Sequence, residues 1–381
     1  MRIVVSNDNP AALLPFTHVN PLWDVNVGGI TLRKWMQAVM PEGELIEHGG
    51  PEHVMTRMMP CVVVNGRLLP SSTLADILHR FVREGRVRRC MAGDEIGCGY
   101  LTGKDAPVPE IMPEDITIMR GPWDIISTLP QTLHTVASLF IPHYAEVRPN
   151  VFVGKNVTVP PTVVTRTDDG PIVIGSGSVF ESFVALEGPV VIGEDCIIRD
   201  FACIKKSAIG NVCRIGGELE RSVIGDYTNK QHYGYVGHSV VGSWVNLGAG
   251  TTTSDLKHTY GSVRIDRGAG KEETGLQFCG SFIGEGSRTT VNTTLMTGSV
   301  LGVSTFAFGT VHGFVPSFTA ATSQGFTEVP LEIALRGLER AFARRKVTMT
   351  PPIRDAYTVA FERTAVVRDA YKVKRGVPLT F

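Results

Sequence analysis

The chain has 381 residues, more than the roughly 150 residues of an ordinary compact domain, so its length indicates at least two structural units. Its 37 lysine and arginine side chains balance 37 aspartate and glutamate side chains. No overall positive field therefore draws the protein to nucleic acid or to an anionic membrane, and an anionic substrate must be held by local charges.

Two further features exclude other classes of protein. The sequence contains no apolar run long enough to cross a bilayer, and no secretory signal precedes the strand-like residues 3–5. The seven cysteines form no C-x-x-C pair and no zinc-site spacing, which is typical of reduced, mostly buried thiols. We therefore expect a cytoplasmic protein that binds no structural metal.

Residues 1–122 are predicted to form an α/β domain with a parallel or mixed sheet. Apolar runs at residues 3–5, 61–64 and 116–119 predict strands, and residues 72–84 predict a helix. One face of this helix is apolar and consists of Leu74, Ile77, Leu78 and Phe81.

Helices are predicted on both sides of the central segment. A connecting helix lies within residues 123–145, with apolar residues at helical spacing. The C-terminal segment, residues 319–381, contains an amphipathic helix at 330–346 that ends before Pro351 and Pro352. We expect the basic tail after these prolines to pack on the outside of the protein.

A repeat begins near residue 151 and dominates the centre of the chain. An aliphatic residue followed by glycine recurs at spacings mostly near multiples of six, at Val153, Ile174, Ile192, Ile209, Ile215, Ile224, Val236, Val241, Leu247, Ile283 and Leu301. Each hexad predicts one short strand and one corner, with the aliphatic side chain inward and the glycine in the turn. This register favours a parallel β-helix over residues 146–318 rather than a β-sandwich with glycine turns.

Three polar segments interrupt this rhythm. Residues 165–170 are predicted to form a loop that leaves a corner. Residues 229–234 form a hexad whose inward position holds Lys230 instead of an aliphatic residue, and residues 254–274 form a longer polar excursion. Because the last two interrupt the core close together, we expect a functional site there.

The sequence from Ile224 to Ser254, IGDYTNKQHYGYVGHSVVGSWVNLGAGTTTS, resembles the acetyltransferase half of the bacterial bifunctional enzymes that acetylate glucosamine 1-phosphate and then uridylylate it. The family pattern IG-x4-N-H-L-x-Y-x-G-x3-IG-x2-VNIGAGT is matched together with its irregular spacings of 12, 5 and 6 residues. The resemblance implies a left-handed parallel β-helix, acetyl-CoA as acyl donor, an amino sugar phosphate or nucleotide sugar as acceptor, and a homotrimer with active sites between the prisms.

The same resemblance assigns candidate roles to particular residues. His232 falls on the family's catalytic histidine, and imidazole is suited to accept the proton that an amine loses when it attacks a thioester. Tyr235 falls on the substrate-binding tyrosine. The other candidates for substrate binding are Lys230, Asn246, Asp255, Lys257 and Arg221. The candidates for contact with coenzyme A are Ala249 and Gly250, whose turn offers backbone amides, and Ala307 in a later coil.

Some positions depart from the family pattern. Asp255 replaces an asparagine, Glu220 replaces the first of two lysines that bind the sugar phosphate, and Lys257 is the nearest counterpart of a later phosphate-binding lysine. His238, six residues after His232, is expected to have a structural role, because two histidines without a third ligand make a poor metal site. These departures leave the sugar and the acyl group open.

The N-terminal residues resemble a degenerate sugar nucleotidyltransferase, through the segments 14–17, 21–24 and 28–32. Working members carry a glycine-rich loop directly after the first strand, because backbone amides must approach the nucleotide phosphates closely. Residues 6–10 contain no glycine, and the pair Gly28-Gly29 comes later and predicts a turn. We therefore expect little or no pyrophosphorylase activity, with Mg²⁺ required only if this domain is active.

Three functional hypotheses remain open. The leading one is an acyl-CoA-dependent N-acetyltransferase of the hexapeptide-repeat type. The second is a sugar-1-phosphate nucleotidyltransferase with an unusual phosphate loop. The third is a β-helix scaffold without catalytic activity, which Glu220 and Asp255 favour.

Overall fold

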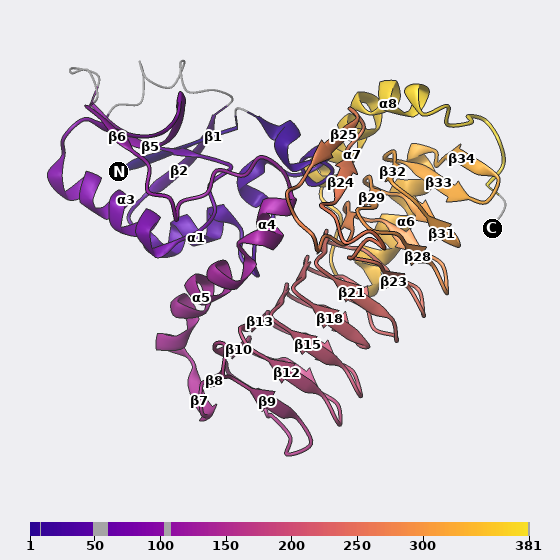
Figure 1. The fold of residues 1–381 in the computed structure, drawn as a ribbon, viewed down its shortest axis with the longest axis horizontal. Coiled ribbons are helices and arrows are strands. Elements are labelled where there is room, and N and C mark those ends of the chain that lie inside the picture. Colours follow the sequence, from indigo (N-terminus) through magenta and orange to yellow (C-terminus); the bar gives the residue numbers. More distant parts are fainter. Residues whose placement is uncertain (8, 49–59, 103–107, 380–381) are drawn as a thin grey trace.

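The computed structural model describes residues 1–381 except 8, 49–59, 103–107 and 380–381. An N-terminal α/β domain, a long parallel β-helix and a set of C-terminal helices follow one another along the chain (Figure 1). The predicted fold class is therefore confirmed. Within the described part of the chain, no helix combines the length and the apolar character needed to cross a membrane.

A mixed six-stranded sheet forms the core of the N-terminal domain, in the order β2-β1-β3-β5-β4-β6. Its strands are β1 Arg2–Ser6, β2 Glu44–His48, β3 Cys61–Asn65, β4 Arg88–Ala92, β5 Glu95–Leu101 and β6 Val108–Ile111. β1 pairs in parallel with β2 and β3, whereas β5 pairs antiparallel with β3 and β4. The mixed sheet that the sequence predicted is thus present.

The helices of this domain are α1 Leu32–Val39 and α3 Ser72–Glu84, with 3-10 turns at Pro10–Leu13, Phe16–His18 and Leu22–Asp24. α3 has the predicted bounds. The hydroxyl of Ser71 accepts a hydrogen bond from the amide of Leu74 at 3.1 Å, and Gly85 ends the helix with φ 60°. The apolar face predicted for α3 is buried.

Two predicted elements before the β-helix differ from the structure. Residues 116–119 form no strand, because they lie against the turn that follows β3, where Ile118 makes an isolated bridge with Leu68. The connecting helix is divided into α4 Trp123–Ser127 and α5 Leu129–Phe140. Pro130 lacks an amide hydrogen and stands in the first turn of α5, where no partner is needed.

One face of the β-helix, which we call face 1, carries ten strands in one sheet. These strands are β7 Ala145–Arg148, β8 Val151–Val153, β10 Ile172–Ile174, β13 Val190–Ile192, β16 Ala208–Ile209, β19 Val223–Ile224, β22 Val240–Val241, β26 Phe282–Ile283, β29 Val300–Leu301 and β32 Phe314–Val315. All of them pair in parallel except β7.

Face 1 is buried on both of its sides. Ile192 and Ile209 point into the prism core, whereas the neighbouring Val191 and Ala208 belong to the core of the N-terminal domain. α5 also packs on β10 and β13. The N-terminal domain therefore lies across face 1. This burial on both sides explains why the strands of face 1 consist of consecutive apolar residues.

The other two faces complete the triangular prism. Face 2 consists of β11 Val179–Phe180, β14 Ile197–Ile198, β17 Arg214–Ile215, β20 Asn229–Lys230, β27 Arg288–Thr289, β30 Phe306–Ala307, and β33 Thr319–Thr322 with its antiparallel partner β34 Gly325–Glu328. Face 3 consists of β9 Val164–Arg166, β12 Ala185–Glu187, β15 Cys203–Lys205, β18 Glu218–Glu220, β21 Tyr235–Gly237, β23 Thr252–Thr253, β28 Thr294–Leu295 and β31 Thr310–Val311. Each coil therefore visits face 2, face 3 and face 1 in turn.

The polar segments add detail that the repeat did not predict. Residues 165 and 166 lie in β9 rather than in a loop, because they pair with β12. The excursion contains an antiparallel hairpin of β24 Arg264–Asp266 and β25 Lys271–Glu273. Arg267 in this hairpin donates hydrogen bonds to the carbonyl oxygens of Ala11 and Ala12. The excursion is thereby tied to the N-terminal domain.

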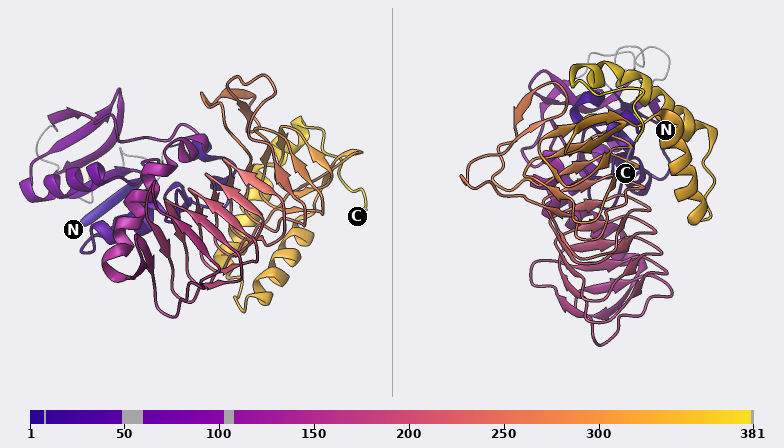
Figure 2. Two further views of the ribbon diagram at one scale, coloured as in Figure 1. Left: turned by 60° about the horizontal axis from the view of Figure 1, so that its bottom comes forward. Right: turned by 90° about the vertical axis from the view of Figure 1, so that its right-hand side faces the viewer.

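The C-terminal segment forms three helices, α6 Leu331–Arg344, α7 Pro351–Arg363 and α8 Ala365–Ala370, along one side of the prism (Figure 2). The single helix and tail predicted here are thus corrected. Pro351 and Pro352 begin α7, where a missing amide costs no hydrogen bond. Phe342 of α6 stacks on Trp244 with ring centroids 3.8 Å apart, and Trp244 stacks on Tyr227 at 4.2 Å.

Candidate functional site

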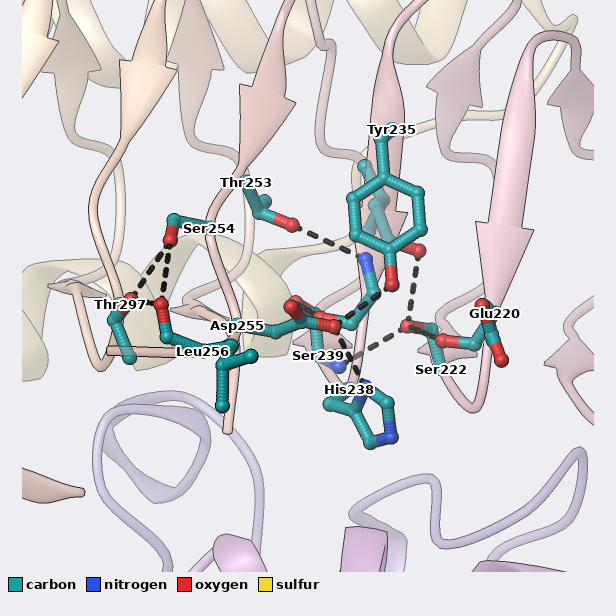
Figure 3. Close-up of polar contacts among 12 residues, drawn as sticks. Glu220, Ser222, Tyr235, His238, Ser239, Thr253, Ser254, Asp255, Leu256 and Thr297 are labelled. Carbon is teal, nitrogen blue, oxygen red and sulfur yellow. Dashed lines mark hydrogen bonds and ion pairs between the residues drawn. The ribbon is translucent and has the colours of Figure 1, made fainter. Parts of the chain in front are cut away.

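Three polar side chains from two segments of the chain meet at the corner between face 3 and face 1 (Figure 3). The Oδ2 atom of Asp255 accepts a hydrogen bond from the Tyr235 hydroxyl at 2.7 Å and lies 2.7 Å from Nδ1 of His238. The side chains of His238 and Asp255 are 12% and 14% exposed. A largely buried carboxylate therefore holds a phenol and an imidazole at the same oxygen atom.

A glycine in β21 allows Tyr235 to reach this position. Gly237 lies two residues later and so on the same side of the strand. A β-carbon at Gly237 would come within 2.0 Å of the Tyr235 hydroxyl oxygen. The absence of a side chain at Gly237 therefore lets the phenol extend along the strand to Asp255.

The two ends of the excursion form a neck that positions Asp255 and a second aromatic ring. Leu256 and Phe278 make an antiparallel bridge, and the amide of Cys279 donates to the carbonyl oxygen of Asp255 at 2.8 Å. The ring of Phe278 stacks on His238 with centroids 5.2 Å apart. The neck thus supplies a carboxylate to one edge of the imidazole and an aromatic ring to its face.

The electrostatics of the cluster follow from burial and hydrogen bonding. Burial acts to raise the pKa of Asp255, but the hydrogen bonds from His238 and Tyr235 hold that pKa below its ordinary value. Burial and the bond to Asp255 raise the pKa of Tyr235, so the phenol stays protonated. An ionised carboxylate only accepts hydrogen bonds, so His238 carries its hydrogen on Nδ1.

The predicted catalytic residue, His232, lies at the other end of β21, at the corner between face 2 and face 3. Its side chain is exposed, and its carbonyl oxygen accepts a hydrogen bond from Nζ of Lys230 at 2.9 Å. Since this corner and the corner of His238 are separated by the length of β21, the two imidazoles mark opposite edges of face 3.

Lys230 occupies the inward position that the hexad predicted. It is 2% exposed, and its ammonium group also donates to the carbonyl oxygen of Gly234 at 2.7 Å. Burial lowers the pKa of Lys230 to about 8, against the opposing effect of the Glu218 carboxylate. From inside the prism Lys230 supports the backbone of the corner, and the substrate-binding role expected for it stays a prediction.

The residues expected to contact coenzyme A have backbone groups already engaged in the fold. The amide of Gly250 and the carbonyl oxygens of Ala249 and Ala307 have backbone partners, which are Tyr233, Asn292 and Thr290, respectively. The side chain of Ala307 is buried in the prism core. Directly after it lies a cavity of about 610 Å³, lined by Phe308, Gly309, Thr322, Gln324, Lys374 and Leu379 among others.

The other predicted substrate-binding residues occupy three different places. Asn246 is exposed on face 2, where it bridges neighbouring coils. Nζ of Lys257 donates to the carbonyl oxygen of Ser262 within the excursion. Arg221 stands at the corner between face 3 and face 1, one coil before His238, and both residues have positive φ. The structure therefore brings Tyr235 and Asp255 together, whereas the charge of Arg221 acts on the carboxylate of Asp169, on an earlier coil.

His238 belongs to this polar cluster, whereas the sequence predicted a structural role for it. The available signal was Asp255, an acid where the family pattern has an asparagine. A carboxylate at this position can orient the imidazole of a neighbouring histidine. The family resemblance instead drew attention to His232. Only the neck of the excursion brings Asp255 to His238 across 17 residues of sequence.

In the N-terminal domain, the Gly28-Gly29 pair forms the predicted turn. Oδ1 of Asn26 accepts hydrogen bonds from both glycine amides, at 3.1 Å and 2.8 Å. A β-carbon at Gly29 would lie 3.0 Å from Cγ1 of Val191 on face 1. The turn therefore allows the domain to approach the β-helix closely.

Comparisons with known proteins find a family match for the N-terminal part of the chain and several curated relatives. Residues 2–140 match the family described as sugar nucleotidyl transferase. The bifunctional protein GlmU of Synechococcus elongatus is 28% identical over 204 residues, which cover 52% of this chain and 40% of that protein. A bifunctional sugar-1-phosphate nucleotidylyltransferase/acetyltransferase of Sulfurisphaera tokodaii is 34% identical over 85 residues, or 22% of this chain and 21% of that protein. The chain thus spans less than half the length of these curated relatives.

Solved structures with a similar course of the chain include the UDP-N-acetylglucosamine acyltransferase of Francisella novicida. It is 17% identical and matches 60% of this chain and 86% of its own, with a TM-score of 0.33. The family match lies in the part of the chain that precedes the β-helix. The chain is therefore similar to GlmU proteins, and a segment that matches the sugar nucleotidyl transferase family precedes a parallel β-helix.

Proposed function

We propose that this protein is an acyl-CoA-dependent N-acyltransferase whose acceptor is an amino sugar phosphate or a nucleotide-linked amino sugar. The observation that carries the proposal is the hydrogen bond between Tyr235 and Asp255, two residues that the resemblance assigned to substrate binding. They are 20 residues apart in sequence and meet on the outside of face 3. Both interruptions of the aliphatic core, at Lys230 and at the excursion, adjoin this surface.

The proposed acceptor fits the groups around this surface. A phosphate needs cationic donors, and Arg221 offers a guanidinium at the same corner as His238. A sugar needs polar groups that fix its orientation, and the Tyr235–Asp255 pair offers them. For the proton acceptor, the resemblance offers His232 as one candidate, at the opposite edge of face 3.

The proposed donor is acetyl-CoA or another short acyl-CoA. The cavity of about 610 Å³ beside Phe308 and Gly309 lies within the roughly 300–1,000 Å³ range of ligand sites. Its position directly after Ala307 supports the proposal that the coenzyme A arm lies along the last coils. Lys374 provides a cation for the phosphates of the donor.

A homotrimer is proposed as the active assembly. Two aromatic rings on successive coils, Phe183 and Phe201, stack at 5.4 Å between centroids and are 59% and 72% exposed. Tyr233, at the same corner between face 2 and face 3, is 66% exposed. Exposed apolar side chains in a row are typical of a surface that another subunit covers. Light scattering that finds a monomer at micromolar concentration would count against the trimer.

Nucleotidyl transfer is the second candidate function, and the family match over residues 2–140 favours it. The proposal is that this activity is weak or lost. The Gly28-Gly29 turn packs on face 1, and the carbonyl oxygen at the end of β1, that of Ser6, is bonded to the amide of Gly66. Release of pyrophosphate from a nucleoside triphosphate, a sugar 1-phosphate and Mg²⁺ would restore this candidate.

The acyltransfer proposal is tested by mixing the protein with acetyl-CoA and a panel of amino sugar phosphates and nucleotide-linked amino sugars. Free thiol is followed with a chromogenic disulfide, and the acylated sugar is identified by mass spectrometry. Release of thiol that depends on one acceptor supports the proposal. If the folded protein releases no thiol with any acceptor, the acyltransfer proposal is rejected and the scaffold hypothesis is favoured.

A further inference from the structure

We propose that His238, oriented by Asp255, accepts the proton that the acceptor amine loses during acyl transfer. The inference rests on the proposed acyltransferase function and adds a catalytic residue to it. It is carried by the arrangement of Asp255 on the Nδ1 side of the imidazole and of Phe278 on the ring face. The other edge of the ring, with Nε2, points away from Asp255 (Figure 3).

The hydrogen bond to Asp255 decides which nitrogen can act as a base. Asp255 accepts through Oδ2, so Nδ1 of the neutral imidazole carries the hydrogen and Nε2 carries the lone pair. The side chain as a whole is 12% exposed, and Nε2 points away from Asp255 (Figure 3). Such a histidine has the tautomer that a general base needs.

The carboxylate is held in place from several parts of the chain. The neck is closed by the Leu256–Phe278 bridge. The hairpin beyond it is anchored to the N-terminal domain by Arg267 and to the C-terminal segment by a hydrogen bond from the Tyr371 hydroxyl to Asp266 at 2.7 Å. Catalytic groups act well when their supporting shell is rigid. This bracing accounts for an excursion that interrupts the β-helix at this corner.

The proposed step is balanced in atoms and charge. The neutral amine attacks the thioester carbonyl carbon, so a C–N bond forms and the nitrogen loses one proton to Nε2 of His238. The C–S bond then breaks, and the imidazolium returns the proton to the departing thiolate. The products are the amide and the free thiol, with no oxidant or metal in the balance.

Two other assignments compete with this one. His232 has the position of the family base, but its imidazole has no carboxylate partner among the contacts of the described residues. A structural role for His238 would also explain a buried hydrogen bond to Asp255. The titratable and charged groups around His238 are Asp255, Tyr235 and Cys279, with Glu220 and Arg221 on the preceding coil.

The test compares steady-state kinetics of the full chain and four variants over pH 5 to 9. His238→Ala removes the imidazole, and His238→Asn keeps a donor near the Nδ1 position while removing Nε2. Asp255→Asn keeps the size of the orienting side chain without its charge. His312→Ala is the matched control, because His312 is exposed at the same corner after β31 and is no part of the cluster.

We expect both His238 variants to lower kcat by about 10²- to 10⁴-fold, the range for loss of a general base, with KM for acetyl-CoA unchanged. The acidic limb of the pH–rate profile should disappear in His238→Asn, a result that a structural role does not produce. Asp255→Asn should lower kcat by a smaller factor than the His238 variants do, and it should shift the acidic limb of the pH–rate profile. His312→Ala should match the unaltered protein.

The outcomes separate this inference from the proposed function. If His238→Asn keeps the activity of the unaltered protein and the acidic limb of its pH–rate profile, the inference is overturned. The proposed acyltransferase function then still stands. If the unaltered protein transfers no acyl group, the function fails, and ¹⁵N NMR of the His238 ring still tests the geometry. A hydrogen on Nδ1 at neutral pH supports the orientation by Asp255, and a hydrogen on Nε2 overturns it.

Discussion

The side-chain amide of Asn20 donates a hydrogen bond of 2.6 Å to Oε1 of Glu285, so the N-terminal domain is joined to a β-helix corner 265 residues later. Glu285 is 7% exposed, and its other oxygen, Oε2, has no hydrogen-bond partner among the described residues. It borders a small polar cavity of about 80 Å³ that is also lined by Asp24, Asp226 and Ser243. A carboxyl group in this position is stable when neutral, and burial raises its pKa to about 8.

This raised pKa predicts a loss of stability in mildly alkaline solution. The folded state holds the proton of Glu285 up to about pH 8, whereas the unfolded state releases it near the ordinary value of 4.5. The stabilisation is complete below pH 4.5 and is lost as the pH rises through about 8. The change is of the order of a few kcal/mol, because one pKa unit corresponds to about 1.4 kcal/mol.

Glu285→Gln replaces the neutral acid by a neutral amide and should flatten this pH dependence. Thermal melting temperatures at pH 5, 7 and 9 give the comparison, with the exposed Glu332→Gln as control. If the unaltered protein and Glu285→Gln lose stability in parallel from pH 5 to pH 9, Glu285 is not the group responsible.

Lys230 should contribute to stability rather than to substrate binding. Lys230→Ala leaves the carbonyl oxygens of His232 and Gly234 without their donor and opens a void in the prism. We expect the free energy of unfolding to fall by about 3 kcal/mol, from the combined cost of the void and the unpaired acceptors. Lys230→Met fills most of the void, so its free energy of unfolding should fall by less than that of Lys230→Ala. Chemical denaturation measures both, and an unchanged midpoint for Lys230→Ala contradicts the structural role.

Gly237→Ala tests the position of Tyr235 without removing a functional group. The new methyl group would come within 2.0 Å of the phenol oxygen, so Tyr235 must leave Asp255. Tyr235→Phe breaks the same hydrogen bond directly. We expect both variants to lower kcat/KM for the acceptor by about 10-fold, because a hydrogen bond to a charged group contributes about 1.5–3 kcal/mol. Full activity of Gly237→Ala would show that the Tyr235–Asp255 contact is unnecessary.

The aromatic column of Tyr227, Trp244 and Phe342 should hold α6 on the β-helix. Trp244→Ala removes the central ring, and we expect a loss of about 3–5 kcal/mol in the docking of the C-terminal helices. Limited proteolysis should then cut between α6 and α7 faster than in the unaltered protein. Tyr260→Ala is the control, because Tyr260 is exposed and lies in the excursion. Equal rates of cleavage in Trp244→Ala and the control would contradict this role.

The β-helix was predictable because its signal is local and repeated. Each aliphatic residue and its glycine specify one strand and one turn, and the strands of face 1 lie where Ile174, Ile192 and Ile209 placed them. α3 was predictable for the same reason, since a single segment carries its cap, its apolar face and its terminal glycine. The strand expected at residues 116–119 was wrong, because an apolar run does not reveal whether a partner strand lies beside it.

The candidate site was predictable in part. Tyr235 and Asp255 were singled out by the spacing of a family pattern, and Lys230 by a break in the aliphatic rhythm. The inward burial of Lys230 and the partnership of His238 with Asp255 depend on coils that stack and on a neck that closes. Sequence order carries no direct measure of such contacts.

Periodicity was sufficient to establish a β-helix and the region where its core is interrupted, because these follow from short-range preferences of single hexads. Which polar side chains meet was settled by packing between distant segments. The Leu256–Phe278 bridge places Asp255 against His238, and the docking of the N-terminal domain on face 1 places Asn20 against Glu285. Burial then raises the pKa of Glu285, and burial acts to raise that of Asp255 while hydrogen bonds lower it, because these surroundings exist only in the folded chain.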